Sequence, residues 1–170
     1  MICRWLLFCA VVLCSGCYSL KGISIPATIS TFYIDQFQNS VSNAPPDVGQ
    51  RFSEEFRDVV LQNTRLTYDE QIPDIEFTGA ISSFTVQSVA PERSTDGDVV
   101  SFGSSLNRLN ISVRVEYVNN LDVDDAWKQS FSFFQDFEND QDLAQVQDDL
   151  IEEIFDQILQ DIFTKAFTNW

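Results

Sequence analysis

Arg108-Leu109-Asn110-Ile111-Ser112-Val113-Arg114-Val115-Glu116-Tyr117 is the most regular stretch of this sequence, because polar and apolar side chains alternate along its whole length. Successive side chains of a β-strand point to opposite faces of a sheet, so the alternation predicts a strand with one buried face and one face in water. We therefore expect an antiparallel sheet that is covered on one side only, with a polar surface on the other side.

The segment after this strand predicts its hairpin partner. Residues 119–125 are rich in Asn and Asp, which is typical of a turn. The return strand that follows is expected to carry its large apolar side chains at Trp127, Phe131, Phe133 and Phe137.

The segments before the strand complete the sheet. Residues 75–89 predict a long strand whose apolar phase slips by one position at Ser82-Ser83, which indicates a β-bulge. Shorter strands are expected at 28–37 and 66–69, where β-branched and aromatic residues gather. Residues 91–105 predict a polar loop.

Two segments have the apolar spacing of helices. The first is expected to begin near Asp47, whose carboxylate can cap the first turn, and to end around Gln62-Asn63. Its apolar stripe consists of Val48, Phe52, Phe56, Val59 and Val60.

The second helix is expected from Leu143 to about Thr168, with the acidic residues Asp140 and Asp142 at its start, where the helix dipole favours negative charge. Its apolar arc is broader than contact with one sheet requires. Either the arc also packs on the first helix, or part of it meets a partner. Together the elements predict an α+β fold, a two-layer sandwich with two helices packed on one face of a mainly antiparallel sheet of four or five strands.

The first residues have the composition of a bacterial lipoprotein signal. Arg4 precedes a short apolar run over 5–13, which is too short to cross a bilayer. The sequence Leu13-Cys14-Ser15-Gly16-Cys17 resembles a lipobox, which predicts cleavage between Gly16 and Cys17 and a diacylglycerol on the Cys17 sulfur. The alternatives are an ordinary secretory signal and an N-terminal membrane anchor.

This interpretation divides the chain into three parts: a signal peptide at 1–16, a lipidated tether at 17–27 and a single domain at 28–170. All four cysteines lie at or before Cys17, so the mature chain would keep one, occupied by lipid. No disulfide could then form, and the fold would depend on its core alone.

The charge balance excludes some functions. The chain carries 10 basic and 26 acidic residues, a formal net charge of −16, and loss of Arg4 with the signal would leave 9 − 26 = −17. Nucleic-acid binding needs a basic surface and is excluded, and broad attraction to anionic lipid is disfavoured.

Little in the sequence suggests an enzyme. There is no histidine among the 170 residues and no Gly-rich phosphate loop. Acidic residues alternate from Asp136 to Asp142 like half of a calcium loop, but Gln141 and Gln147 stand where an EF-hand needs Gly and Glu. We expect no metal site, no cofactor beyond the acyl lipid, and no catalysis.

Several short motifs, in their order, carry a family resemblance: Cys17-Tyr18-Ser19-Leu20-Lys21-Gly22, Leu106-Asn107-Arg108-Leu109-Asn110-Ile111, Gln129-Ser130-Phe131-Ser132, Asp149-Leu150-Ile151-Glu152-Glu153 and the C-terminal 161–170. Together they resemble the LptE-like lipopolysaccharide-assembly lipoproteins. The resemblance implies two helices on a mainly antiparallel sheet. It also implies an outer-membrane lipoprotein that sits as a plug in an LptD-type β-barrel and helps assemble lipopolysaccharide at the cell surface.

The resemblance also implies basic residues that contact lipopolysaccharide phosphates. Arg108 and Arg114 share the wet face of one strand, and guanidinium groups suit phosphate oxygens. The alternative is that both arginines pair with carboxylates of this acidic chain. Tyr18 after the lipidated cysteine, in place of an aspartate, indicates the outer membrane. No acidic run follows the cysteine, so we expect the domain to face the periplasm.

A function of another class stays open at this point. The broad arc of the second helix could line an apolar pocket with a few polar groups, as in a periplasm-facing lipoprotein that binds a small apolar or lipid ligand.

Overall fold

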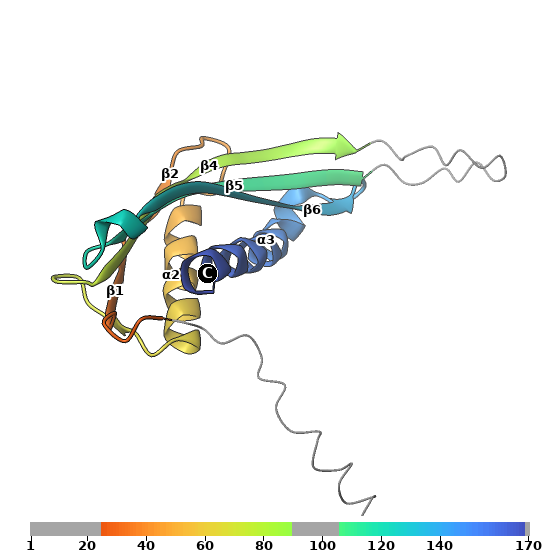
Figure 1. Cartoon of the computed structure of the whole chain (residues 1–170). Coiled ribbons are helices and arrows are strands. Elements are labelled where there is room, and N and C mark those ends of the chain that lie inside the picture. Colours follow the sequence, from red (N-terminus) through yellow and green to blue (C-terminus); the bar gives the residue numbers. More distant parts are fainter. Residues whose placement is uncertain (1–24, 90–105, 169–170) are drawn as a thin grey trace, which may run out of the picture.

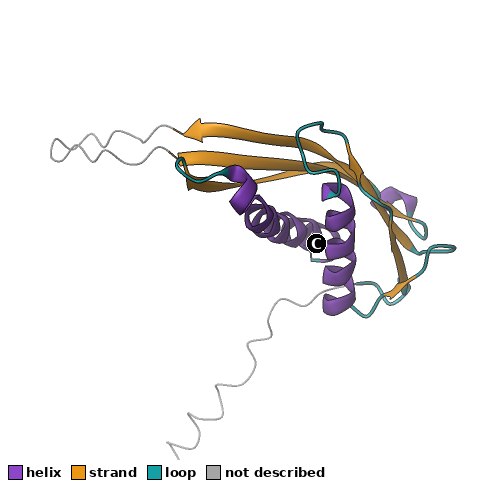
Figure 2. Cartoon of the chain, turned by 180° about the vertical axis from the view of Figure 1, so that it is seen from behind, coloured by secondary structure: helices purple, strands orange, loops and turns teal. Residues whose placement is uncertain are grey.

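The computed structural model describes residues 25–89 and 106–168. The predicted loop at 91–105 lies outside these residues. The described chain forms one sheet with two helices on the same face, so it has the expected two layers and α+β class (Figure 1). In the view from behind, α2 and α3 again lie together on one side of the sheet (Figure 2).

The sheet has six strands, one more than the upper expectation of five. They are β1 (Thr31–Ile34), β2 (Gln38–Asn39), β3 (Thr67–Tyr68), β4 (Ile75–Val89), β5 (Leu106–Asn119) and β6 (Trp127–Glu138). The order is β3-β1-β4-β5-β6, with β2 pairing farther along β4. The long strands β4, β5 and β6 are antiparallel, whereas the short strands join in parallel.

The extra strand arises because the expected strand at 28–37 is divided into β1 and β2. Phe37 leaves the sheet between them and is buried, at 1% exposure, with its ring 4.9 Å from that of Phe52. Its amide donates to the Ser53 hydroxyl oxygen at 2.8 Å instead of to a strand. A Cβ on Gly49 would clash with the carbonyl oxygen of Phe37, so glycine is what lets the helix approach this bend.

The two helices are α2 (Val48–Asn63) and α3 (Leu143–Phe167), and a short 3-10 helix, η1 (Val123–Asp125), lies in the β5–β6 turn. The expected bounds of both helices are confirmed to within a residue. The expected cap at Asp47 is wrong, because this side chain makes no capping hydrogen bond. Asp142 does cap α3, its carboxylate accepting from the amide of Ala144 at 3.1 Å.

The core lies between the helices and the inner face of the sheet. On β5 the inner residues Leu109, Ile111, Val113 and Val115 are all at 0% exposure. The Phe52 ring of α2 meets the Phe155 ring of α3 edge to face at 5.0 Å. The broad arc of α3 is therefore explained in part by packing on α2, the first of the two alternatives.

The predicted bulge is confirmed as a register shift between Ile81 and Ser83. The shift places both Ile81 and Phe84 on the buried face, with 0% and 2% exposure. Without it, Phe84 would point to the polar face, because side chains alternate along a strand.

Candidate interaction surfaces

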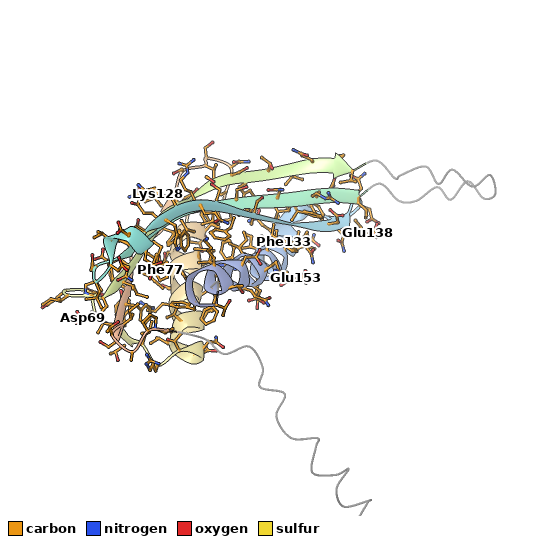
Figure 3. All side chains as sticks on the ribbon, viewed as in Figure 1. Asp69, Phe77, Lys128, Phe133, Glu138 and Glu153 are labelled. Carbon is orange, nitrogen blue, oxygen red and sulfur yellow. The ribbon has the colours of Figure 1, made fainter. Side chains whose placement is uncertain are left out.

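The helix-free side of the sheet is a polar surface, which we call the open face. Residues opposite each other in register share a face, so side chains of three strands meet there. They are Thr78, Ala80, Ser83, Thr85 and Gln87 of β4, Arg108, Asn110, Ser112, Arg114 and Glu116 of β5, and Lys128, Ser130, Ser132, Phe134 and Asp136 of β6. The wet positions predicted from the sequence of β5 are thus confirmed, and Figure 3 shows side chains projecting from this side of the ribbon.

Hydroxyl and amide groups cross-link the middle of the open face. The Ser112 hydroxyl donates to that of Ser132 at 3.0 Å, and Ser132 donates to the side-chain oxygen of Asn110 at 3.1 Å. These hydrogen bonds connect β5 to β6 through polar groups, so the middle of the open face is cross-linked and still polar.

Arg108 is engaged within the open face. Its Nε and one terminal nitrogen donate to the two carboxylate oxygens of Asp136, at 2.7 and 2.9 Å. Its guanidinium lies 3.7 Å from the centre of the Phe134 ring, a cation–π contact. The hydrogen bonds from Arg108 lower the pKa of Asp136. For Arg108, pairing with a carboxylate is therefore what the structure shows.

Arg114 has different surroundings. It is exposed and stands between Ala80 and Ser130, neither of which carries charge. The third cation of this face, Lys128, pairs with Glu116 at 2.8 Å. Among the described residues, Arg114 is the cation of the open face that makes no ion pair. It lies about 20 Å from Arg108 by the rise of a strand, so the two do not converge on one phosphate.

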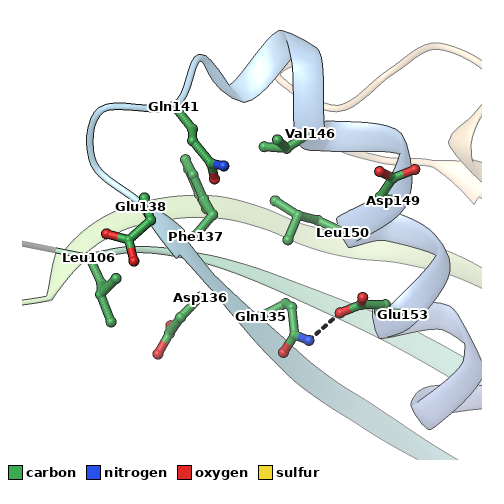
Figure 4. A pocket seen from close by; sticks show the side chains of 10 residues that line it. All are labelled: Leu106, Gln135, Asp136, Phe137, Glu138, Gln141, Val146, Asp149, Leu150 and Glu153. Carbon is green, nitrogen blue, oxygen red and sulfur yellow. Dashed lines mark hydrogen bonds between the residues drawn. The ribbon is translucent and has the colours of Figure 1, made fainter.

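The edge of the sheet at β6 borders a groove of about 490 Å³ between β6 and the start of α3 (Figure 4). Leu106, Phe137, Val146 and Leu150 form its apolar part. Its polar residues are Gln135, Asp136, Glu138, Gln141, Asp149 and Glu153. The Gln135 amide donates to the Glu153 carboxylate across the groove.

The described residues can also be compared with a metal site, an apolar pocket and a membrane-spanning helix. Within the described ranges, no group of His, Cys, Asp and Glu side chains could hold a metal ion. The groove is lined by more polar than apolar residues, unlike the apolar pockets that hold small ligands. Neither α2 nor α3, the helices of the described chain, is long and apolar enough to span a membrane.

Cys17 and Gly16, the expected lipidation and cleavage residues, lie outside the described residues. Among the described strands, β6 pairs with β5 alone, so its other edge is free within residues 25–89 and 106–168. Sequence reasoning did not predict this edge. A signal for it was present, because residues 129–135 form an uncharged, Phe-rich run without proline, but sequence alone does not show which strand ends the sheet.

The described residues define a small α+β domain with a polar sheet surface on the side away from its helices. The chain belongs to the LptE lipopolysaccharide-assembly family, whose family model matches residues 29–166. The expected family and its two-helix fold are thereby confirmed.

No curated protein matches the sequence. Among solved structures, the hypothetical protein CT253 from Chlamydia trachomatis is similar, with a TM-score of 0.53 and 12% identity over 83% of this chain and 99% of that one. A minor lipoprotein from Acinetobacter baumannii has a TM-score of 0.49 and 8% identity over 81% and 92% of the two chains. Lipoprotein B from Nitrosomonas europaea has a TM-score of 0.46 and 14% identity over 87% of this chain and 88% of that one. At 12% identity the likeness to CT253 concerns the fold.

Proposed function

We propose that this protein is an outer-membrane lipoprotein of the lipopolysaccharide-assembly machinery, acting as a plug and assembly factor for an LptD-type β-barrel. The observation that carries the proposal is the match of the family model to residues 29–166, nearly the whole domain. A rigid domain with an open polar face and an exposed edge, and without a metal-holding group in its described part, suits holding and guiding rather than reacting.

The anchor is part of the same proposal. Signal peptidase removes residues 1–16, cutting between Gly16 and Cys17, and Cys17 carries the diacylglycerol and a further acyl chain such as palmitate. Residues 17–27 would then form the tether between the lipid and the domain. The domain then faces the periplasm at the outer membrane.

Arg114 is the better candidate for a lipopolysaccharide phosphate contact. It is exposed and makes no ion pair among the described residues, whereas the donors of Arg108 are directed at Asp136. A guanidinium held on a rigid strand can form two parallel hydrogen bonds to a phosphate. The net charge of −16 opposes any broad electrostatic attraction of the glycolipid, so the contact depends on this local group.

The test of the function is purification of a C-terminally tagged chain from gently solubilised envelopes, together with depletion in the cell. We expect a large β-barrel protein to co-purify and surface lipopolysaccharide to fall on depletion. A chain that purifies alone, in cells whose surface lipopolysaccharide is unchanged by depletion, would contradict the proposal.

The test of the anchor is Cys17→Ser. We expect this variant to lose the acyl mass increment and to move from the membrane to the periplasmic fraction. Cys3→Ser is the matched control, which removes a sulfur outside both the apolar run and the lipobox and is expected to keep both lipid and membrane association. A Cys17→Ser chain with unchanged mass and location would rule out lipidation at this residue.

A further inference from the structure

We propose that the free edge of β6 accepts an extended segment of a partner protein as an added strand, and that this segment carries basic and apolar side chains. The identity of the partner as the β-barrel rests on the proposed function. The proposal that a basic and apolar strand docks at this edge does not depend on the proposed function.

The direction of the backbone groups along β6 follows from hydrogen bonds at the other side of the sheet. The amide of Asp35 donates to the carbonyl oxygen of Phe77 at 2.9 Å, and the amide of Ser40 to that of Ile81 at 3.2 Å. In this part of β4, the backbone N–H and C=O groups of odd-numbered residues thus point toward β1 and β2. Those of even-numbered residues such as Ala80 point toward β5.

The strand register then gives the direction of the backbone N–H and C=O groups of β6. Ala80 lies opposite Arg114, and Arg114 lies opposite Ser130. Arg114 therefore directs its backbone groups to β4, and Ser130 directs its own away from β5. The same holds for every second residue of the strand, so Lys128, Ser130, Ser132, Phe134 and Asp136 point their N–H and C=O groups out of the sheet.

This edge lacks the devices that usually prevent strand addition. Natural edges are short, bulged, interrupted by proline or charged in the middle. β6 runs for 12 residues, pairs with β5 without a register shift, and has no charge or proline between Gln129 and Gln135. Lys128 and Asp136 stand only at the two ends of this uncharged run.

The surroundings of the edge define the partner's chemistry. An added strand would lay alternate side chains over the groove, which offers a small apolar seat: Val146 is partly exposed there, and Phe137 and Leu150 are buried at 6% and 7% exposure. Asp149 is exposed beside that seat, and Glu153 lies across from Gln135. These carboxylates favour lysine or arginine on the incoming strand.

The same charges oppose a second copy of this chain as the occupant. Edge-to-edge pairing of two β6 strands would bring two α3 helices, each with Asp149 and Glu153, to the same side of a joined sheet. It would also join two chains that each carry a net charge of −16. Like charges placed together destabilise an interface, so we assign the edge to a basic partner.

The direct test is amide hydrogen exchange by NMR on the purified domain with a short capped peptide of alternating lysine and valine. At ten times its Kd, the peptide is expected to slow exchange at Ser130, Ser132 and Phe134 by about tenfold, because exchange then requires dissociation. A peptide of equal charge whose central valine is proline is the control, and it is expected to give no such protection. Protection spread evenly over the acidic surface, or equal effects of both peptides, would overturn the proposal.

Ser130→Pro tests the edge itself. Proline removes an N–H that points away from β5, so the β5–β6 hydrogen bonds remain and the fold is expected to persist. Loss of one hydrogen bond should weaken the lysine–valine peptide about two- to tenfold. Ser130→Thr keeps the N–H and is expected to bind like the wild type. Equal peptide affinity in both variants would contradict strand addition.

Asp149→Lys tests the charge independently of any effect of proline on folding. It is expected to weaken the peptide more than Glu54→Lys, the same charge change at an exposed site on α2. Equal losses would show attraction by net charge only and would overturn the docking site. A dimer of the free domain that Ser130→Pro dissociates would likewise overturn it in favour of a second copy.

The two proposals can fail separately. If the barrel co-purifies equally with wild type and Ser130→Pro, the edge is not the contact and the proposed function stands. If no barrel co-purifies while the peptide still pairs with β6, the edge assignment stands and the proposed function fails.

Discussion

The two faces of β5 are held in different ways. Its inner side chains, from Leu109 to Val115, are fully buried against the helices, whereas Ser112 and Arg114 between them face water. The inner face is fixed by close packing, in which any lost volume is costly. The open face is held by hydrogen bonds, ion pairs and the contact of Arg108 with the Phe134 ring, and Arg114 on it is exposed. Substitutions on the two faces should therefore differ in their cost to stability.

Phe77→Ala should have the largest effect on stability. Phe77 is at 0% exposure on the inner face of β4, with its ring 4.8 Å from that of Phe56. Its truncation leaves a cavity and should lower the free energy of unfolding by about 3–5 kcal/mol. Thr78→Ala, one residue along on the open face, should cost below about 1 kcal/mol. Urea denaturation measures both, and similar losses would break the division between the faces.

Glu55→Gln should raise the free energy of unfolding, and the size of this gain should depend on pH. Glu55 of α2 is half-buried, and desolvation raises its pKa from 4.5 to about 7, opposed by Arg51 and assisted by Asp156, Glu152 and Asp58. A raised carboxyl pKa stabilises the fold at low pH, and this contribution is lost as pH rises from about 4.5 through about 7.

The variant should therefore gain about 1–2 kcal/mol over wild type at pH 8, after allowance for solvent screening, and little at pH 4.5. Glu54→Gln, the exposed neighbour on the same helix, is the control and should change little at either pH. Thermal melts across this range measure the difference. A constant effect of Glu55→Gln at every pH would contradict the assigned cause.

Arg108→Ala should have a small effect on stability. The ion pair with Asp136 is partly exposed, at 33% and 29% of the two side chains, and such pairs contribute about 0–1 kcal/mol. The depressed pKa of Asp136 means that its contribution is present above the ordinary carboxyl pKa and is lost as pH falls. If Arg108→Ala lowered the free energy of unfolding as much as Phe77→Ala, the open face would stabilise the fold as strongly as the core does.

Arg114→Ala should leave stability unchanged to within about 0.5 kcal/mol, because it is an exposed residue outside any ion pair of the described chain. If it contacts phosphate, binding of lipopolysaccharide to the domain should weaken, and Arg114→Lys should restore only part of it. Arg108→Ala is the matched comparison on the same strand. Equal binding by wild type and both alanine variants would remove these arginines from the proposal.

Much of the fold could be predicted because alternation and helical spacing are local properties. The strand at 75–89 and the bulge at Ser82-Ser83 are confirmed, because both follow from the alternation of apolar side chains along this segment. The bend at Phe37 was not predictable, since it depends on packing against Phe52 and on the distant Gly49 and Ser53.

The site was harder to predict than the fold. The polar character of the open face is visible in the sequence of β5, but the state of each arginine depends on its cross-strand neighbours. Arg108 lies opposite Asp136, and Arg114 lies opposite Ser130, a difference set by the register of β6. The free edge is likewise a matter of strand order, which single-strand patterns do not encode.

The most direct measurement of the central idea, a domain that holds a barrel by its exposed sheet, is quantitative mass spectrometry of tagged chains purified from solubilised envelopes. We predict a large β-barrel protein in near-equal amount with the wild type, retained with Ser130→Thr and reduced with Ser130→Pro. Recovery of the wild-type chain without such a protein, from membranes that still contain it, would contradict the account.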